Sequence, residues 1–185
     1  MMKLYSRKLT GLILVALLLA GCTGVPDGIT PVKNFEIKRY LGKWYEIARL
    51  DHRFERGMNQ VTAEYRLSDD GGIEVINRGY VVEDGQWKTA NGKAYFMDGP
   101  DTGHLKVSFF GPFYASYVIF ELDYVGYEYA FVTSHDKSYV WLLSRTPTIS
   151  EPVKQLFLDR ARQLGFPTQD LIFVDHFPKV SFREI

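Results

Sequence analysis

The stretch VTAEYRLSDDGGIEVINRGYVV, residues 61–82, determines the fold class of this chain. Every second residue from 61 to 67 is apolar and the residues between are polar, which is the two-residue period of a half-buried β-strand. Asp69-Asp70-Gly71-Gly72 follows, and this composition favours a tight hairpin connection. The stretch therefore predicts two antiparallel strands joined by a short turn.

Further short β-like runs lie on both sides of this hairpin, and a turn signal separates each run from the next. Eight such runs with short connections predict antiparallel neighbours in an up-and-down order. Eight strands can close into a barrel whose interior holds one small ligand. We therefore predict an all-β, eight-stranded antiparallel up-and-down barrel, with Asn91-Gly92 as a bend or bulge. The runs are residues 44–50, 61–67, 73–82, 87–97, 105–110, 117–122, 127–133 and 139–143.

The hydrophobic period changes after the last of these runs. Apolar side chains between residues 153 and 164 recur at helical spacing. Ser150 is a suitable N-cap, Pro152 is tolerated in the first turn, and Gly165 favours termination. We expect one C-terminal amphipathic helix packed outside the barrel, and a short ninth strand at residues 171–174.

The first 21 residues have the layout of a secretory signal peptide. Three basic side chains within residues 1–8 precede an apolar centre at residues 12–20 and a small-residue exit. This apolar centre is shorter than the roughly 20 residues that span a bilayer, so an uncleaved anchor is the less favoured alternative. The mature protein would retain 164 of the 185 residues, which suits one domain.

Leu19-Ala20-Gly21-Cys22 contains the only cysteine and resembles the lipobox of bacterial lipoproteins. The resemblance implies cleavage before Cys22 and attachment of several acyl chains to it, which gives stable membrane attachment. Thr23, in place of an aspartate, implies the outer membrane, with the periplasmic face favoured. With Cys22 lipidated, no intramolecular disulfide can form. We expect residues 22–33 to be a lipidated flexible tether and residues 34–185 to form the barrel domain.

Charge and composition narrow the function classes. The chain has 22 basic and 22 acidic residues and no long run of one sign, which argues against nucleic-acid binding. Thirteen Phe, twelve Tyr and three Trp suit half-buried strands and also apolar ligand cavities. The four histidines show no metal-ligand spacing, and no nucleotide or hydrolase motif occurs in the sequence. We therefore expect no metal, no cofactor and no catalytic residue.

Three segments resemble the motifs of the lipocalin family. Gly42-Lys43-Trp44-Tyr45-Glu46 matches the Gly-x-Trp signature of the first strand. Asp123-Tyr124, with Tyr127 and Ala130, resembles the second motif, and Arg145 matches the third. The three motifs occur in order, at the expected strands.

The resemblance implies structural roles at the closed end of the barrel for Gly42, Trp44 and Arg145. The Arg145 guanidinium would cover the Trp44 ring, an arrangement worth about 0.5–2 kcal/mol. With the lipobox and residues 45–49 and 109–114, the chain resembles the bacterial outer-membrane lipocalins, a subgroup similar to apolipoprotein D. This resemblance implies binding of lysophospholipids or fatty acids.

Alternation along the strands gives candidate ligand-lining residues. If Trp44 points inward, Glu46 and Ala48 do so too, and Glu46 then needs a hydrogen-bond partner unless the alternation breaks. Tyr139 and Trp141 share the parity of Arg145 and lie further from the closed end. The candidate lining residues are Ala48, Ala63, Tyr65, Phe96, Val107, Phe109, Tyr117, Ile119, Tyr139 and Trp141.

The densest charged cluster, residues 51–56, is expected in the first long loop at the barrel mouth. Its arginines, Arg53 and Arg56, are either solvated or contact a lipid phosphate or carboxylate.

These observations predict an outer-membrane-anchored lipid-binding protein that is not an enzyme. One alternative is a carrier of haem or another planar apolar ligand. A second is a lipocalin-type lipid- or isoprenoid-modifying enzyme, for which Glu46 or a histidine at the mouth would have to supply acid–base chemistry. A third is an envelope protein whose interior is filled by its own aromatics. Aromatic side chains on the outer wall would also allow a homodimer.

Overall fold

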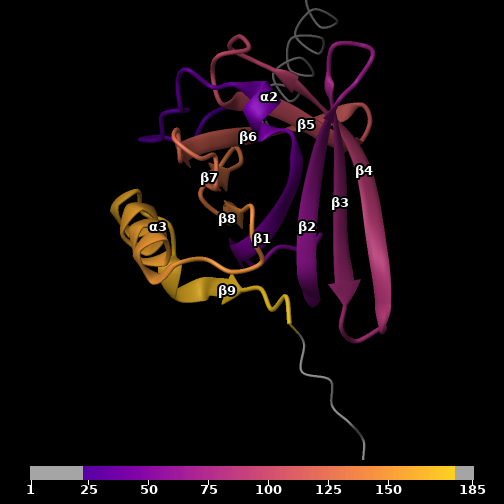
Figure 1. Ribbon diagram of the computed structural model, residues 1–185, viewed down its shortest axis with the longest axis vertical. Helices are drawn as coiled ribbons and strands as arrows, with labels where there is room; N and C mark the ends of the chain where they lie inside the picture. Colours follow the sequence, from indigo (N-terminus) through magenta and orange to yellow (C-terminus); the bar gives the residue numbers. More distant parts are fainter. Residues whose placement is uncertain (1–22, 178–185) are drawn as a thin grey trace, which may run out of the picture.

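The computed structural model describes residues 23–177. Eight consecutive strands form an antiparallel barrel: β1 (Gly42–Leu50), β2 (Met58–Leu67), β3 (Ile73–Val81), β4 (Gln86–Phe96), β5 (His104–Phe110), β6 (Phe113–Leu122), β7 (Tyr129–Thr133) and β8 (Val140–Ser144). Each strand pairs with the next, and β1 closes the ring by pairing with both β2 and β8 (Figure 1). The predicted eight-stranded up-and-down barrel is confirmed.

The remaining elements lie at the two ends of the chain. A short helix that the sequence did not predict, α2 (Ile37–Tyr40), precedes β1, whereas the predicted helix α3 (Glu151–Gln163) packs on the outer wall. The strand β9 (Leu171–Phe173) follows a 3₁₀ turn, η1 (Thr168–Asp170), and pairs with the end of β1 outside the barrel. Across residues 23–177, no helix has the length and hydrophobicity needed to span a membrane.

The ends of α3 agree only partly with the sequence signals. Gly165 takes φ of +81°, a left-handed conformation that ends a helix readily because glycine lacks a Cβ. Ser150 occupies the N-cap position, but its side chain makes no capping hydrogen bond.

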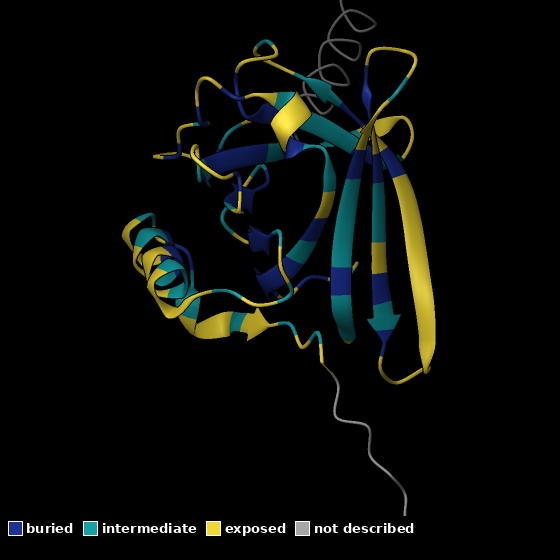
Figure 2. Ribbon diagram, in the orientation of Figure 1, coloured by how far each residue is buried: buried dark blue, intermediate teal, exposed yellow. Residues whose placement is uncertain are grey.

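Buried side chains form two layers on opposite sides of the barrel wall. One layer fills the closed end of the barrel around Trp44. The other lies between the wall and α3, where Phe157 packs against Phe131 with ring centroids 5.0 Å apart. Figure 2 shows that β4, far from α3, is exposed along most of its length.

A β-bulge in β1 changes which side chains face the interior. The pairing of β1 with β8 shifts register between Glu46 and Ala48, so alternation breaks at this point. Ala48 therefore lies in the layer beneath α3 and not in the barrel interior, which corrects its predicted position. Leu50 lies in the same layer. The Arg49 side chain turns to Glu46 and is almost fully buried.

The predicted bend at Asn91-Gly92 is wrong. The β3–β4 ladder runs without a register shift from Ile73 to Val81. Gly92 is needed for a different reason: a Cβ at this position would lie 2.7 Å from the Ser108 carbonyl oxygen and 2.8 Å from the Phe109 ring. The glycine therefore allows β4 to pass close to β5.

Residues 23–33, here called the N-terminal strap, pack on the barrel and do not form the flexible tether that the sequence suggested. Ile29 and Val32 are buried. The Val32 amide donates to the Ile119 carbonyl (2.9 Å), and the Val32 carbonyl accepts from the Gly103 amide (2.9 Å). Apolar side chains at positions 25, 29 and 32 give the strap a buried side. The predicted signal peptide and lipidation site, residues 1–22, lie outside the described residues.

Candidate ligand-binding site

The barrel encloses a cavity of about 790 Å³, here called the calyx. This volume lies within the range of about 300–1,000 Å³ that is usual for small-molecule sites. Phe35 and Tyr40 line its closed end, whereas Arg53, Phe113 and His135, from loops or strand ends at the opposite side, line its mouth. Most of the wall between is aliphatic or aromatic.

The closed end is a stack of three side chains. The Arg145 guanidinium carbon lies 3.9 Å from the centroid of the Trp44 ring, and Trp44 lies 4.6 Å from the ring of Tyr40. Arg145 also donates to the carbonyls of Arg39, Lys43 and Tyr127 (2.6–3.2 Å). These contacts tie the start of β1 to the end of β8.

Gly42 lies beside this stack, with φ of +89°. Glycine adopts this conformation at little cost, whereas most other residues would be strained. The structure thus places Gly42, Trp44 and Arg145 together at the closed end of the barrel.

A chain of three tyrosine hydroxyls crosses the bottom of the calyx. Tyr117 Oη lies 2.7 Å from Tyr40 Oη and 2.7 Å from Tyr65 Oη. Burial raises the pKa of all three hydroxyls well above the ordinary value, so the chain is neutral. Alternation placed Tyr65 and Tyr117 inside but did not reveal Tyr40, because the short helix that carries it was not predicted.

Towards the mouth, five side chains form the polar cluster of the calyx wall: Glu46, Arg49, His52, Glu55 and Trp141. Arg49 Nη1 donates to Glu46 Oε1 (2.6 Å), and Arg49 is almost fully buried. Trp141 Nε1 donates to Glu55 Oε2 (3.2 Å). The cluster joins β1 and β8 to the loop between β1 and β2.

The two carboxyls of the cluster have opposite pKa shifts. Burial, followed by the charge of Glu55, raises the pKa of Glu46 well above its ordinary value. Burial also opposes ionisation of Glu55, but the hydrogen bond and charge of His52 lower the pKa of Glu55 below its ordinary value. Of the two carboxyls, Glu46 therefore holds a proton more readily than Glu55.

His52 connects this cluster to the cavity. Its Nε2 lies 2.9 Å from Glu55 Oε2, and neither of the buried ring nitrogens has another hydrogen-bond partner among residues 23–177. Within the same residues, no group of three His, Cys, Asp or Glu side chains is arranged to hold a metal ion. His52 therefore lines the calyx with its ring, whereas both ring nitrogens are buried in the wall.

The structure brings most of the predicted lining residues to the calyx. Ala48 lies beneath α3, Phe96 packs against Phe35 with ring centroids 6.1 Å apart, and Ile119 is buried beneath the strap, so these three do not reach the cavity. The seven predicted residues that line it are Ala63, Tyr65, Val107, Phe109, Tyr117, Tyr139 and Trp141.

The two arginines proposed for the mouth differ in position. Arg53 borders the calyx, with its guanidinium carbon 4.8 Å from the Phe54 ring centroid. Arg56 is exposed, forms an ion pair with Asp51 (2.8 Å) and does not line the cavity.

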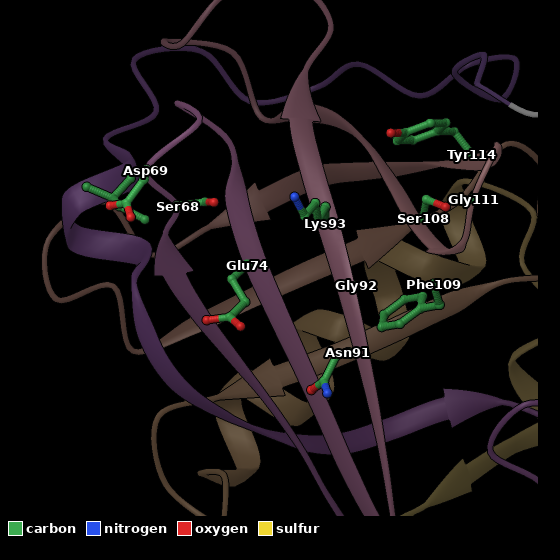
Figure 3. Close-up of a pocket in the computed structure, with 11 residues that line it drawn as sticks. Ser68, Asp69, Glu74, Asn91, Gly92, Lys93, Ser108, Phe109, Gly111 and Tyr114 are labelled. Atoms are coloured by element: carbon green, nitrogen blue, oxygen red, sulfur yellow. The ribbon is translucent and has the colours of Figure 1, made fainter.

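A second, more open hollow of about 480 Å³ lies over β3, β4 and β5, and is here called the outer hollow. Figure 3 shows Glu74, Asn91 and Lys93 on neighbouring strands at this site. Its lining combines charged and amide side chains with Phe109 and Tyr114, in contrast to the mainly apolar calyx.

Comparison with known proteins agrees with this architecture. The family model of the lipocalin-like domain matches residues 35–176. The chain belongs to the lipocalin family. It is 58% identical over 163 residues to outer membrane lipoprotein Blc of Vibrio cholerae, covering 88% of this chain and 95% of the relative. It is 53% identical to outer membrane lipoprotein Blc of Escherichia coli K12, covering 86% and 90%.

More distant lipocalins share the fold. Apolipoprotein D of Mus musculus is 34% identical, covering 62% of this chain and 63% of the relative. Insecticyanin of Manduca sexta superposes with a TM-score of 0.65 at 21% identity, covering 84% of this chain and 88% of that one. The similarity to outer membrane lipoproteins, together with the lipobox, supports a lipid-anchored location at the outer membrane.

Proposed function

We propose that this lipocalin binds a single-chain amphiphile, a lysophospholipid or a fatty acid, in its calyx, and stores or transports it for maintenance of the cell envelope. The observation that carries the proposal is a mainly apolar cavity of about 790 Å³ with polar groups towards its mouth. The acyl chain would lie between the apolar walls, above the tyrosine chain. The head group would lie near His52 and Arg53, and the Arg53 guanidinium can donate to phosphate or carboxylate oxygens.

Burial of an acyl chain supplies enough free energy for this function. Each methylene removed from water contributes about 0.8 kcal/mol, so a chain of about 16 carbons gains up to roughly 13 kcal/mol. Association costs offset about 4 kcal/mol or more of this gain. Micromolar binding needs about 8 kcal/mol and is therefore expected.

Trp141 provides a direct test, because it lines the calyx. Trp87 is exposed on the outer wall and would add an unchanging signal, so Trp87→Phe is the background for the titration. We expect a saturable change in tryptophan fluorescence when lysophosphatidylethanolamine or palmitate is added. Binding of the same lipid is measured in parallel by isothermal titration calorimetry.

The control is Trp141→Phe in the same background. This variant should lose the fluorescence change but retain calorimetric binding, since the acyl chain contacts many other side chains. Absence of saturable binding by both methods, with lysophospholipid and with fatty acid, would refute the proposal.

We further propose that the calyx is a binding site without catalytic activity. Glu46 is the carboxylic acid best placed for proton transfer, but Arg49 already binds it by a hydrogen bond of 2.6 Å. This arrangement suits a structural role. Lipid turnover by the wild-type protein that Glu46→Gln abolishes would favour an enzyme instead.

A further inference from the structure

The N-terminal strap, which follows the predicted lipidation site in the sequence, begins on the outer wall of the barrel. The Thr23 carbonyl accepts a hydrogen bond from His104 Nε2 (3.2 Å), and the Gly24 carbonyl accepts one from Ser116 Oγ (2.6 Å). Both side chains lie on the outer side of the β5–β6 hairpin. Thr23 directly follows the predicted lipidation site in the sequence, so the described part of the chain begins at this wall.

The tip of this hairpin carries two strongly exposed aromatic side chains. Phe110 and Phe113 are 71% and 72% exposed. Both also border the calyx mouth. Phe113 is three positions before Ser116, which corresponds to about 10 Å along a strand, and Phe110 is six positions after His104, which corresponds to about 20 Å. The start of the strap and the exposed tip therefore lie on one hairpin.

Amphipathic side chains occupy the outer surface of the β5–β6 hairpin and the neighbouring strand β4. Lys106 Nζ lies 5.0 Å from the centroid of the Tyr114 ring, which is in turn 6.4 Å from the ring of Tyr95. Tyrosine and lysine suit the boundary between lipid and water, because each has an apolar body and a polar end.

Two basic side chains near this surface are paired with carboxylates, whereas Lys106 contacts the Tyr114 ring. Lys93 is paired with Asp70 (3.2 Å), and His104 is paired with Asp98 (2.7 Å). Attraction to a bilayer would therefore depend on burial of the phenylalanines and only weakly on salt.

We propose that the outer face and tip of the β5–β6 hairpin rest on the bilayer that holds the lipid on Cys22. Phe110 and Phe113 enter the interfacial layer, and the calyx mouth opens at the membrane surface. A single-chain lipid can then pass between bilayer and calyx without crossing bulk water. The bilayer is the occupant because Thr23, which follows the predicted lipidation site in the sequence, is itself bound to this hairpin.

Site-directed labelling tests this orientation. Cys22 is the only cysteine, so once it is lipidated an introduced cysteine provides a unique thiol. Gly111→Cys places a probe at the hairpin tip, where a Cβ meets no atom within 4 Å. Val125→Cys places the matched control in the β6–β7 turn, at a residue that is 91% exposed. Each labelled lipoprotein is reconstituted in vesicles of phosphatidylethanolamine and phosphatidylglycerol.

We expect nitroxide-labelled lipid to quench a fluorophore at residue 111 several-fold more strongly than one at residue 125, and iodide to show the reverse order. Phe110→Ser with Phe113→Ser, both at exposed positions, should reduce the lipid quenching without unfolding the barrel. Equal access of iodide to both probes would overturn the proposal. Protection of residue 111 only at high protein-to-lipid ratio would also overturn it, because a second copy would then cover the tip. Calyx binding is measured separately, so either result leaves the proposed function intact.

Discussion

Glu46 and Glu55 are adjacent carboxyls whose environments favour opposite protonation states. The contribution of each carboxyl to the free energy of unfolding should therefore depend on pH. Burial raises the pKa of Glu46, so its stabilising contribution is complete below the unfolded pKa of about 4.3 and is lost as pH rises through the folded pKa. Glu46→Gln keeps an oxygen for Arg49 but cannot ionise. We therefore expect the free energy of unfolding of Glu46→Gln, relative to wild type, to increase with pH. Urea denaturation at a series of pH values measures it.

Glu55→Gln is the matched control and should give the opposite trend. The pKa of Glu55 is lowered in spite of burial because His52 favours the ionised form, so its contribution is present above the unfolded pKa and is lost as pH falls through the folded pKa. This variant should be less stable than wild type at neutral pH, with a difference that shrinks in acid. Each pKa unit corresponds to about 1.4 kcal/mol. If the free energy of unfolding of both variants, relative to wild type, changed in the same direction with pH, the opposite pKa shifts of Glu46 and Glu55 would be contradicted.

Arg49 and Arg56 lie seven residues apart but in very different surroundings. Arg49 is buried, and besides Glu46 it binds the carbonyls of Glu55 and Met58 (2.8 and 3.1 Å). Arg49→Met leaves these acceptors without their donor and should cost about 3–5 kcal/mol of unfolding free energy. Arg56→Met removes only an exposed ion pair and should cost less than about 1 kcal/mol. Equal losses in urea denaturation would show that the polar cluster does not hold the loop.

At the level of elements, α3 stabilises the barrel from outside, without contact with the calyx. Phe157 is fully buried against Phe131, so Phe157→Ala should lower the free energy of unfolding by about 3–5 kcal/mol. Leu156→Ala, at an exposed position of the same helix, should have little effect. Lipid affinity at low temperature should be unchanged in both variants. A large loss of affinity in Phe157→Ala would mean that α3 shapes the cavity.

The strands were predictable from sequence because their patterning follows from one-sided burial. The clean alternation in residues 61–67 places Ala63 and Tyr65 on the calyx side, as observed. The sequence left a break in the alternation at Glu46 open but could not decide for it, because Ile47 and Ala48 are both apolar and suit either side of the wall. The position of Arg49 depends on Glu46, a partner that the alternation rule does not consider. The polar cluster was missed for this reason.

The strap and α2 show a second limit of sequence reasoning. Proline and glycine in residues 23–33 indicated a flexible linker. Ile29 and Val32 are nevertheless buried, because they pack against apolar side chains that only the folded barrel brings together. Tyr40 was missed in the same way, since a four-residue helix gives no periodic signal. Elements that depend on tertiary contacts for their stability leave little trace in local composition.

For the whole molecule, the calyx and the outer hollow are alternative lipid sites, and neighbouring residues of β4 distinguish them. Ala90 borders the calyx, whereas Asn91 borders the outer hollow. Ala90→Trp should obstruct the calyx and weaken lysophospholipid binding, and Asn91→Trp should leave it unchanged. A lipid present at about 100 times its Kd should stabilise a binding-competent protein by about 2.7 kcal/mol.

Urea denaturation with and without lysophosphatidylethanolamine measures this stabilisation in both variants. Retention of the lipid effect in Asn91→Trp and its loss in Ala90→Trp would place the acyl chain inside the barrel. The opposite result would place it on the outer wall. The tyrosine chain and the polar cluster would then be structural features of an interior that takes no lipid.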